Sequence, residues 1–133
     1  MNRRTFLMTS GALAISPLTL HAATGFVDYT PGLIQQELAA GKTLLVDYAA
    51  VWCSTCRRQE RVINALRAQD PAYDSALTFV RVDWDDYRRH EVTTSRSVPR
   101  RSTLILLRGD QELGRIVAGT SESQIKGLLD LAL

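Results

Sequence analysis

The chain has only two cysteines and two histidines among its 133 residues, and this scarcity limits the sites it can build. A structural zinc site normally takes four cysteine or histidine ligands. No second cysteine pair is present, and His90 is the only histidine beyond the N-terminal segment. We therefore expect no zinc site, and the two cysteines must be explained as a pair.

An excess of charge of either sign is also missing. Sixteen basic and fourteen acidic residues give a formal charge of +2, and two of the basic residues, Arg3 and Arg4, fall in the N-terminal segment. The remainder is close to neutral, which excludes a general nucleic-acid binder. Arginines still gather after the cysteines and after Pro99. They form either a solvated surface or a basic rim that favours a thiolate and steers an acidic partner. These arginines are Arg57, Arg58, Arg61, Arg100 and Arg101.

The N-terminal segment has no apolar run long enough to cross a bilayer comfortably. Its apolar part covers residues 6–15, follows Arg3 and Arg4, and precedes Pro17 and small residues near Ala22. This order is typical of an export signal. We predict that residues 1–23 direct export to the periplasm, and that no stable membrane insertion follows removal of the signal.

The signal resembles the twin-arginine (Tat) type, although Asn2 and Met8 depart from its commonest pattern. A Sec signal, which often carries two arginines, and an uncleaved anchor are the alternatives. We favour Tat.

Residues 24–133 alternate helix and strand patterns, with enough apolar content for one core. Thr30-Pro31 is a good helix start and Gly41 a stop, whereas a polar loop is expected to run to about Ser75. Gly109-Asp110 predicts a hairpin, and residues 121–124 read as a capping box. Helices are predicted at 30–40, after the cysteines to about 69, at 86–95 and at 121–131; strands are predicted at 43–49, 77–83, 103–107 and 113–117. This order predicts one three-layer α/β domain with a central mixed sheet.

Cys53 and Cys56 are spaced Cys-x-x-Cys and lie where the strand at 43–49 gives way to a helix. Unpaired N–H groups and the positive end of a helix dipole stabilise a thiolate. One thiolate can attack a partner's disulfide and the other can release the mixed disulfide. Thiol–disulfide exchange is therefore the leading interpretation. The two cysteines would themselves accept or donate two electrons, so no bound cofactor is expected. The alternatives are a structural disulfide, which constrains so short a loop little, and two unpaired core cysteines.

These patterns resemble thioredoxin-fold thiol–disulfide oxidoreductases across the predicted domain. The resemblance lies in residues 46–48, the Trp-Cys-Ser-Thr-Cys motif at 52–56, residues 77–85, the Val98-Pro99 pair and the closing hairpin with its helix. It implies that Cys53 is the exposed nucleophile and Cys56 the buried resolving thiol. Trp52 is expected to border the site, with simple packing as the alternative.

The resemblance also assigns three supporting residues. Asp47, six positions before Cys53, takes the place of a buried acid that assists proton transfer; burial should raise its pKa, and a purely structural hydrogen bond is the alternative. Val98 and Pro99 are expected to shape the partner-binding groove, with Pro99 as the family's cis-proline. Three residues then separate Pro99 from the next strand, so Ser102 is the other candidate for the cis-proline position.

The resemblance implies exchange of disulfides with protein thiols or disulfides, and we expect a monomer. No histidine lies beside Cys56, which favours a reducing or intermediate potential. Short similarity to the periplasmic domain of DsbD-type reductases suggests a membrane thiol reductase as electron donor. The rival function is an adaptor or copper-handling protein that uses the dithiol as a ligand pair, since soft thiolates suit Cu(I).

Overall fold

The computed structural model describes residues 25–133, so the predicted export signal lies outside the described residues. Five strands and six helices make up this part of the chain. The strands are β1 (Val27–Asp28), β2 (Thr43–Ala49), β3 (Leu77–Asp83), β4 (Thr103–Arg108) and β5 (Gln111–Val117). The helices are α1 (Leu33–Ala39), α2 (Ser54–Gln69), α3 (Ala72–Ala76), α4 (Trp84–Tyr87), α5 (Glu91–Thr94) and α6 (Glu122–Asp130).

The strands form one mixed sheet in the order β1-β3-β2-β4-β5. β1, β3 and β2 run parallel, whereas β4 and β5 pair antiparallel as a hairpin. β2 lies at the centre with every residue buried, as expected for a strand covered on both faces. Its C-terminal end therefore lies in the middle of one edge of the sheet, where the dithiol follows.

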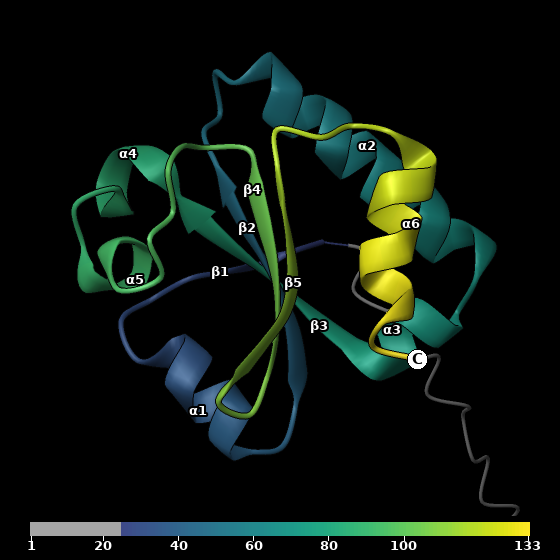
Figure 1. The fold of residues 1–133 in the computed structure, drawn as a ribbon, viewed down its shortest axis with the longest axis horizontal. Helices are drawn as coiled ribbons and strands as arrows, with labels where there is room; N and C mark the ends of the chain where they lie inside the picture. The colour runs from purple at the N-terminus through teal and green to yellow at the C-terminus, as the bar shows by residue number, and fades with distance from the viewer. Residues whose placement is uncertain (1–24) are drawn as a thin grey trace, which may run out of the picture.

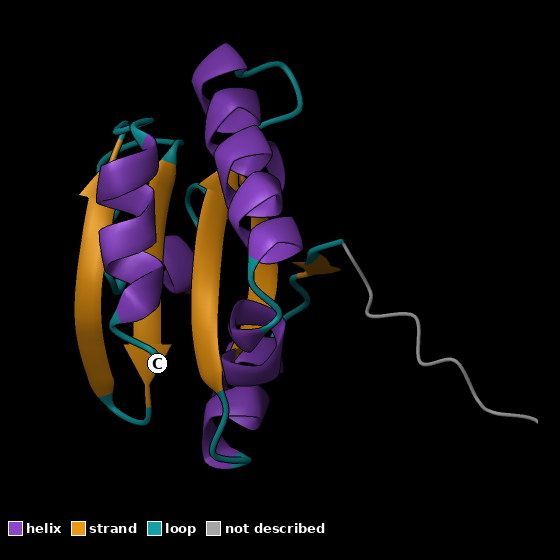
Figure 2. Ribbon diagram, turned by 90° about the vertical axis from the view of Figure 1, so that its right-hand side faces the viewer, coloured by secondary structure: helices purple, strands orange, loops and turns teal. Residues whose placement is uncertain are grey.

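Helices cover both faces of the sheet and make three layers (Figure 1). Helices α2, α3 and α6 lie on one face, and α1, α4 and α5 lie on the other. In the view turned by 90°, the face covered by the long helix α2 and by α6 lies in front of the strands (Figure 2). The predicted three-layer α/β fold with a mixed sheet is confirmed.

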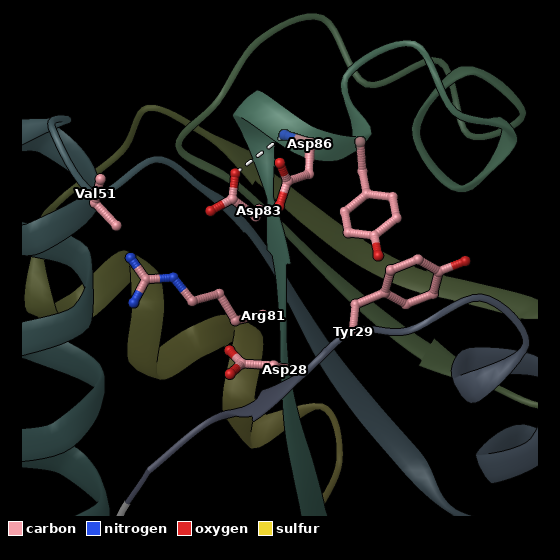
Figure 3. A pocket seen from close by; sticks show the side chains of 7 residues that line it. Asp28, Tyr29, Val51, Arg81, Asp83 and Asp86 are labelled. Atoms are coloured by element: carbon pink, nitrogen blue, oxygen red, sulfur yellow. Dashed lines mark hydrogen bonds between the residues drawn. The ribbon is translucent and has the colours of Figure 1, made fainter.

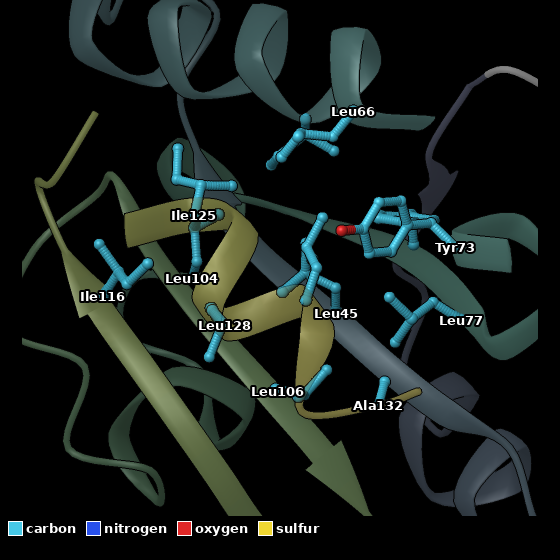
Figure 4. Packing of buried hydrophobic residues seen from close by; sticks show 13 residues of the cluster. Leu45, Leu66, Tyr73, Leu77, Leu104, Leu106, Ile116, Ile125, Leu128 and Ala132 are labelled. Carbon is cyan, nitrogen blue, oxygen red and sulfur yellow. The ribbon is translucent and has the colours of Figure 1, made fainter. Parts of the chain in front are cut away.

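Two apolar cores follow from the alternation of side chains along the strands. Leu45 and Leu104 point toward α2 and α6, where they meet Leu66 and Ile125 (Figure 4). Leu44 and Ile105, one position away, belong to the core on the α1 side. The sheet is therefore held from both sides, and the end of β2 is a rigid platform.

Several predicted boundaries are confirmed. α1 ends just before Gly41, which has a φ of +83° that an L side chain rarely adopts. α6 begins as predicted, because the Ser121 side chain accepts a hydrogen bond from the Gln124 backbone N–H at 3.2 Å. The hairpin at Gly109-Asp110 also forms.

Other local predictions are wrong. α1 begins at Leu33 and not at Pro31, because residues 30–33 first form a turn in which the Leu33 N–H donates to the Thr30 carbonyl. The loop expected to run to Ser75 contains α3, whose Tyr73 packs into the core. The helix expected at 86–95 is two short helices, α4 and α5, and Leu131 lies half exposed beyond the end of α6.

Within residues 25–133, no helix is both long enough and apolar enough to cross a membrane.

Candidate active site

The two cysteines lie at the junction between β2 and α2. Cys53 is the N-cap of α2, and its Sγ accepts a hydrogen bond from the Cys56 backbone N–H at 3.1 Å. The cysteines form a disulfide, with their Cα atoms 5.3 Å apart. The first turn of α2 carries no acidic residue, so the positive end of the helix dipole faces the sulfurs without a counter-charge from that turn.

Both cysteines are buried in this disulfide-bonded state. Cys53 exposes 3% of its surface and Cys56 exposes 1%, so the expected contrast between an exposed and a buried thiol is slight here. The residues just before them are open instead: Val51 is 67% exposed and Trp52 53% exposed. Val51 and Trp52 therefore form an exposed apolar rim beside the buried disulfide.

Trp52 is held in place by two groups from distant segments. Its Nε1 donates to both carboxylate oxygens of Asp85, at 2.9 and 3.2 Å. The Arg101 guanidinium lies over the indole ring, with Cζ 4.4 Å from the ring centroid. Trp52 is therefore a largely exposed side chain beside the disulfide, and these two contacts hold it in one orientation.

Asp47 is a buried carboxyl on the central strand, two residues before β2 ends. It is 1% exposed, and its Oδ1 has no hydrogen-bond partner among the described residues. Burial raises the pKa of Asp47 to about 7; Arg81 lowers it and Glu60 raises it further. The predicted rise is present, and a carboxyl of this pKa can accept or release a proton near neutral pH.

Arg81 and Glu60 lie beside this carboxyl. Arg81 pairs with Asp47 across β3 and β2, and its guanidinium lies 3.7 Å from the Glu60 carboxylate on α2. Arg81 also extends into a hollow of about 300 Å³ that Val51 and Asp83 help to line (Figure 3). Arg81 therefore lies beside the buried acid in the sheet and also lines a hollow at the surface.

Ser102, and not Pro99, lies against the disulfide. The Ser102 Oγ is 3.2 Å from the Cys53 Sγ and 3.1 Å from the Cys56 Sγ. No peptide bond within residues 25–133 is cis, so the prediction of a cis-proline at Pro99 is wrong. Pro99 is exposed in the loop before β4, and Val98 packs against the core on the α1 face. The three residues between Pro99 and β4 bring Ser102 to the end of that loop, directly before the strand.

The sequence interpretation missed Gln59, which lies on α2 one turn after Cys56. Its side chain is fully buried, and its Nε2 donates to the Ser102 carbonyl at 3.0 Å and to the Gly119 carbonyl at 2.9 Å. The signal was available: Gln59, Ile63 and Leu66 follow helical spacing, so a polar residue occupies a core position. The Gln59 side chain therefore connects α2 to the loop that carries Ser102.

Comparison with known proteins agrees with this geometry. The thioredoxin family model matches residues 27–130. Putative thioredoxin-4 of Dictyostelium discoideum is 32% identical over 95 residues, which cover 71% of this chain and 84% of that protein. The crystal structure of Trxlp from Edwardsiella tarda EIB202 superposes with a TM-score of 0.68 at 35% identity, covering 77% of this chain and 97% of that one. Thioredoxin NaTrxh from Nicotiana alata superposes with a TM-score of 0.64 at 27% identity, covering 81% of this chain and 93% of that one.

A Cys-x-x-Cys disulfide at a helix N-terminus, on this sheet and with a buried carboxyl on the preceding strand, defines a thiol–disulfide oxidoreductase. Such enzymes exchange protein disulfides for thiols. The chain belongs to the thioredoxin family.

Proposed function

We propose that this oxidoreductase is exported to the periplasm, where it reduces or exchanges disulfides of partner proteins at a reducing or intermediate potential. The observation that carries the exchange reaction is the disulfide at the α2 N-terminus beside exposed Val51 and Trp52. Export is supported by Arg3 and Arg4 before the short apolar stretch of residues 6–15. A folded substrate protein can lay an extended segment over this apolar rim and present its own disulfide to the sulfurs. A membrane thiol reductase is the proposed electron donor.

Reduction of a partner begins from the dithiol form. The Cys53 thiolate attacks one partner sulfur, a mixed disulfide forms, and the partner's other sulfur leaves as a thiolate that takes up a proton. Cys56 then loses its proton and attacks the Cys53 Sγ. The bond to the partner breaks, and the second partner sulfur leaves. The partner gains two electrons and two protons, and Cys53 and Cys56 are left as the disulfide seen in the structure.

Asp47 is suited to take the Cys56 proton in the second step. Its pKa of about 7 makes the carboxylate available as a base near neutrality. Its position two residues before the end of β2 places it on the strand that leads into the dithiol loop. The unpartnered Oδ1 argues against the structural alternative, in which a hydrogen bond would occupy the carboxyl.

The residues between the cysteines support the proposed potential. Ser54 and Thr55 carry no charge, so no imidazolium stabilises the reduced form beside Cys56. Equilibrium of the purified domain with glutathione buffers of graded ratio tests this point. We expect a potential between those of thioredoxin, about −270 mV, and protein disulfide isomerase, about −180 mV. A value near the −120 mV of DsbA would contradict it.

Reduction of insulin, followed as turbidity, tests exchange with a protein substrate. The reduced protein should accelerate the reaction, and the Cys53→Ser variant should not. Titration of the reduced protein with Cu(I) tests the rival function. Tight stoichiometric copper binding together with absent insulin reduction would favour the copper-handling alternative.

Export is tested with the leader itself. Residues 1–23 are fused to a reporter that folds before transport, and periplasmic reporter is measured. Loss of transport on replacing Arg3 and Arg4 by lysine supports the Tat route, whereas unchanged transport would indicate Sec.

A further inference from the structure

Ser102 is the one side-chain hydroxyl that contacts both sulfurs in the described part of the chain. Its Oγ lies 3.2 Å from the Cys53 Sγ and 3.1 Å from the Cys56 Sγ, and the residue is fully buried. In the disulfide neither sulfur carries a hydrogen, so the Ser102 O–H is the donor in this state. The hydroxyl is therefore shared between the two atoms that exchange bonds during the reaction.

Three hydrogen bonds to the Ser102 backbone hold the residue in this position. Its N–H donates to the Tyr48 carbonyl of β2 at 2.7 Å, and its carbonyl accepts from the Ala118 N–H at 2.8 Å. The Gln59 side chain on α2 adds a third bond to the same carbonyl, at 3.0 Å. The position of the hydroxyl is set by β2, the loop after β5 and the dithiol helix α2.

Ser102 also adopts a costly conformation. Its φ is +63°, in the left-handed region that glycine adopts without strain and a serine rarely does. Such residues persist where the surroundings determine them, and they concentrate at functional sites. A glycine would relieve the strain but would lack the hydroxyl. The presence of serine in this place points to a use for its side chain.

We propose that Ser102 is a catalytic residue that donates its hydroxyl hydrogen bond to whichever sulfur carries negative charge. This inference rests on the proposed disulfide exchange and names a further participant in it. In the reduced protein the hydroxyl and the Cys56 N–H both donate to the Cys53 thiolate. After Cys53 has joined the partner, the hydroxyl turns to the Cys56 thiolate as it attacks. Ser102 keeps its own proton throughout, and only its O–H direction changes.

The proposal has a thermodynamic consequence. A hydrogen bond to a thiolate is charge-assisted and stronger than the bond to a neutral disulfide sulfur. The hydroxyl therefore stabilises the reduced form more than the oxidised form. Its loss should make the protein a stronger reductant, raise the pKa of the Cys53 thiol, and slow the attack on partner disulfides.

The Ser102→Gly variant tests this, because glycine fits the backbone and removes only the hydroxyl. We expect the variant to reduce a small disulfide roughly ten- to hundredfold more slowly. We also expect its equilibrium constant with glutathione to move toward the oxidised protein by about tenfold, which corresponds to a reduction potential lower by about 30 mV. The thiolate absorbance of reduced Cys53 should appear at higher pH. Ser97→Gly is the matched control, because Ser97 also has a positive φ of +53° but is exposed, and it is not among the residues that hydrogen-bond the sulfurs. It should change none of these quantities.

If Ser102→Gly folds and leaves rate, equilibrium and titration unchanged, the proposal is overturned and Ser102 is structural. If it does not fold, Ser102→Ala is compared with wild type, and an unchanged rate, equilibrium constant and titration in Ser102→Ala overturn the proposal. Failure of the proposed function would show differently: the wild-type protein itself would not reduce insulin, whereas the Cys53 titration of the variants would still be informative.

Discussion

The Arg101 guanidinium lies on the indole ring of Trp52, with Cζ 4.4 Å from the ring centroid, and so places a positive charge on the rim of the disulfide. The Arg101 Nε has no hydrogen-bond partner among the described residues. Asp85 holds the same indole from its N–H edge. Of the arginines that the sequence leaves as either a solvated surface or a basic rim, Arg101 is the one that lies on the indole beside the disulfide.

The first prediction concerns this contact. Arg101→Ala should raise the KM for a protein disulfide by about two- to fivefold and leave kcat nearly unchanged, because the contact orients the rim and not the reacting sulfurs. Steady-state kinetics at low and high salt measure it, and the difference should shrink as salt screens the charge. Arg89→Ala, at an exposed arginine between α4 and α5, is the control. An equal loss in both variants would assign the effect to overall charge.

The second prediction links Asp47 to stability. The pKa of Asp47 is about 7 in the folded protein and 3.8 as the ordinary value, so the folded state keeps a proton that the unfolded chain releases. The stability that this proton confers is complete below about pH 4 and is lost as pH rises to about 7. Asp47→Asn should therefore gain about 2–4 kcal/mol relative to wild type between pH 4 and pH 8. Urea unfolding across this range measures it.

Asp110→Asn, in the exposed hairpin turn, is the matched control and should follow the wild-type curve. Parallel curves for wild type and Asp47→Asn would show that Asp47 does not titrate in this range.

The third prediction links Asp47 to catalysis. An amide cannot take the Cys56 proton, so Asp47→Asn should slow release of the mixed disulfide by at least about tenfold near neutral pH. Stopped-flow reduction of a partner disulfide across pH measures it, and the loss should narrow at high pH, where Cys56 ionises without help. Rates equal to wild type at every pH would leave Asp47 with a structural role only.

The fourth prediction concerns Glu60. Its carboxylate pairs with Arg81 at 3.7 Å and raises the pKa of Asp47. Glu60→Gln removes that negative charge and frees Arg81 to act on Asp47, so the pKa of Asp47 should fall and the pH profile of exchange should move toward acid. The shift is expected to be smaller than that caused by burial, because both partners are partly exposed. Glu122→Gln, at an exposed position in the first turn of α6, should leave the pH profile unchanged.

The fifth prediction separates the two cysteines. Cys53 caps α2 beneath the exposed rim, whereas Cys56 lies one turn inside the helix. Cys56→Ser should leave an attacking thiolate whose mixed disulfides persist, and partner proteins should accumulate on it as adducts that a reductant releases. Cys53→Ser should trap almost none. Non-reducing gels followed by mass spectrometry measure both, and preferential trapping by Cys53→Ser would reverse the assignment.

Much of this site could be read from local patterns. The spacing of Cys53 and Cys56 after an apolar strand predicted a dithiol at a helix N-terminus, and an acid inside that strand predicted a buried carboxyl with a raised pKa. These predictions succeeded because strand burial and helix starts depend on residues that are near in sequence. Segments with a weak apolar pattern were not predicted correctly. The two-residue β1 and the short α3 were missed, and the helix expected at 86–95 is divided into α4 and α5.

Sequence by itself determined the order of the main elements, the dithiol and its buried acid, because hydrophobic periodicity and residue chemistry are local. Only the tertiary structure decided which residue faces the sulfurs. Pro99 and Ser102 are three residues apart in one loop, and the choice between them depends on β2, α2 and the loop after β5, which are distant in the chain. Bonds from those elements to the Ser102 backbone hold it at a positive φ that no local preference of serine would select.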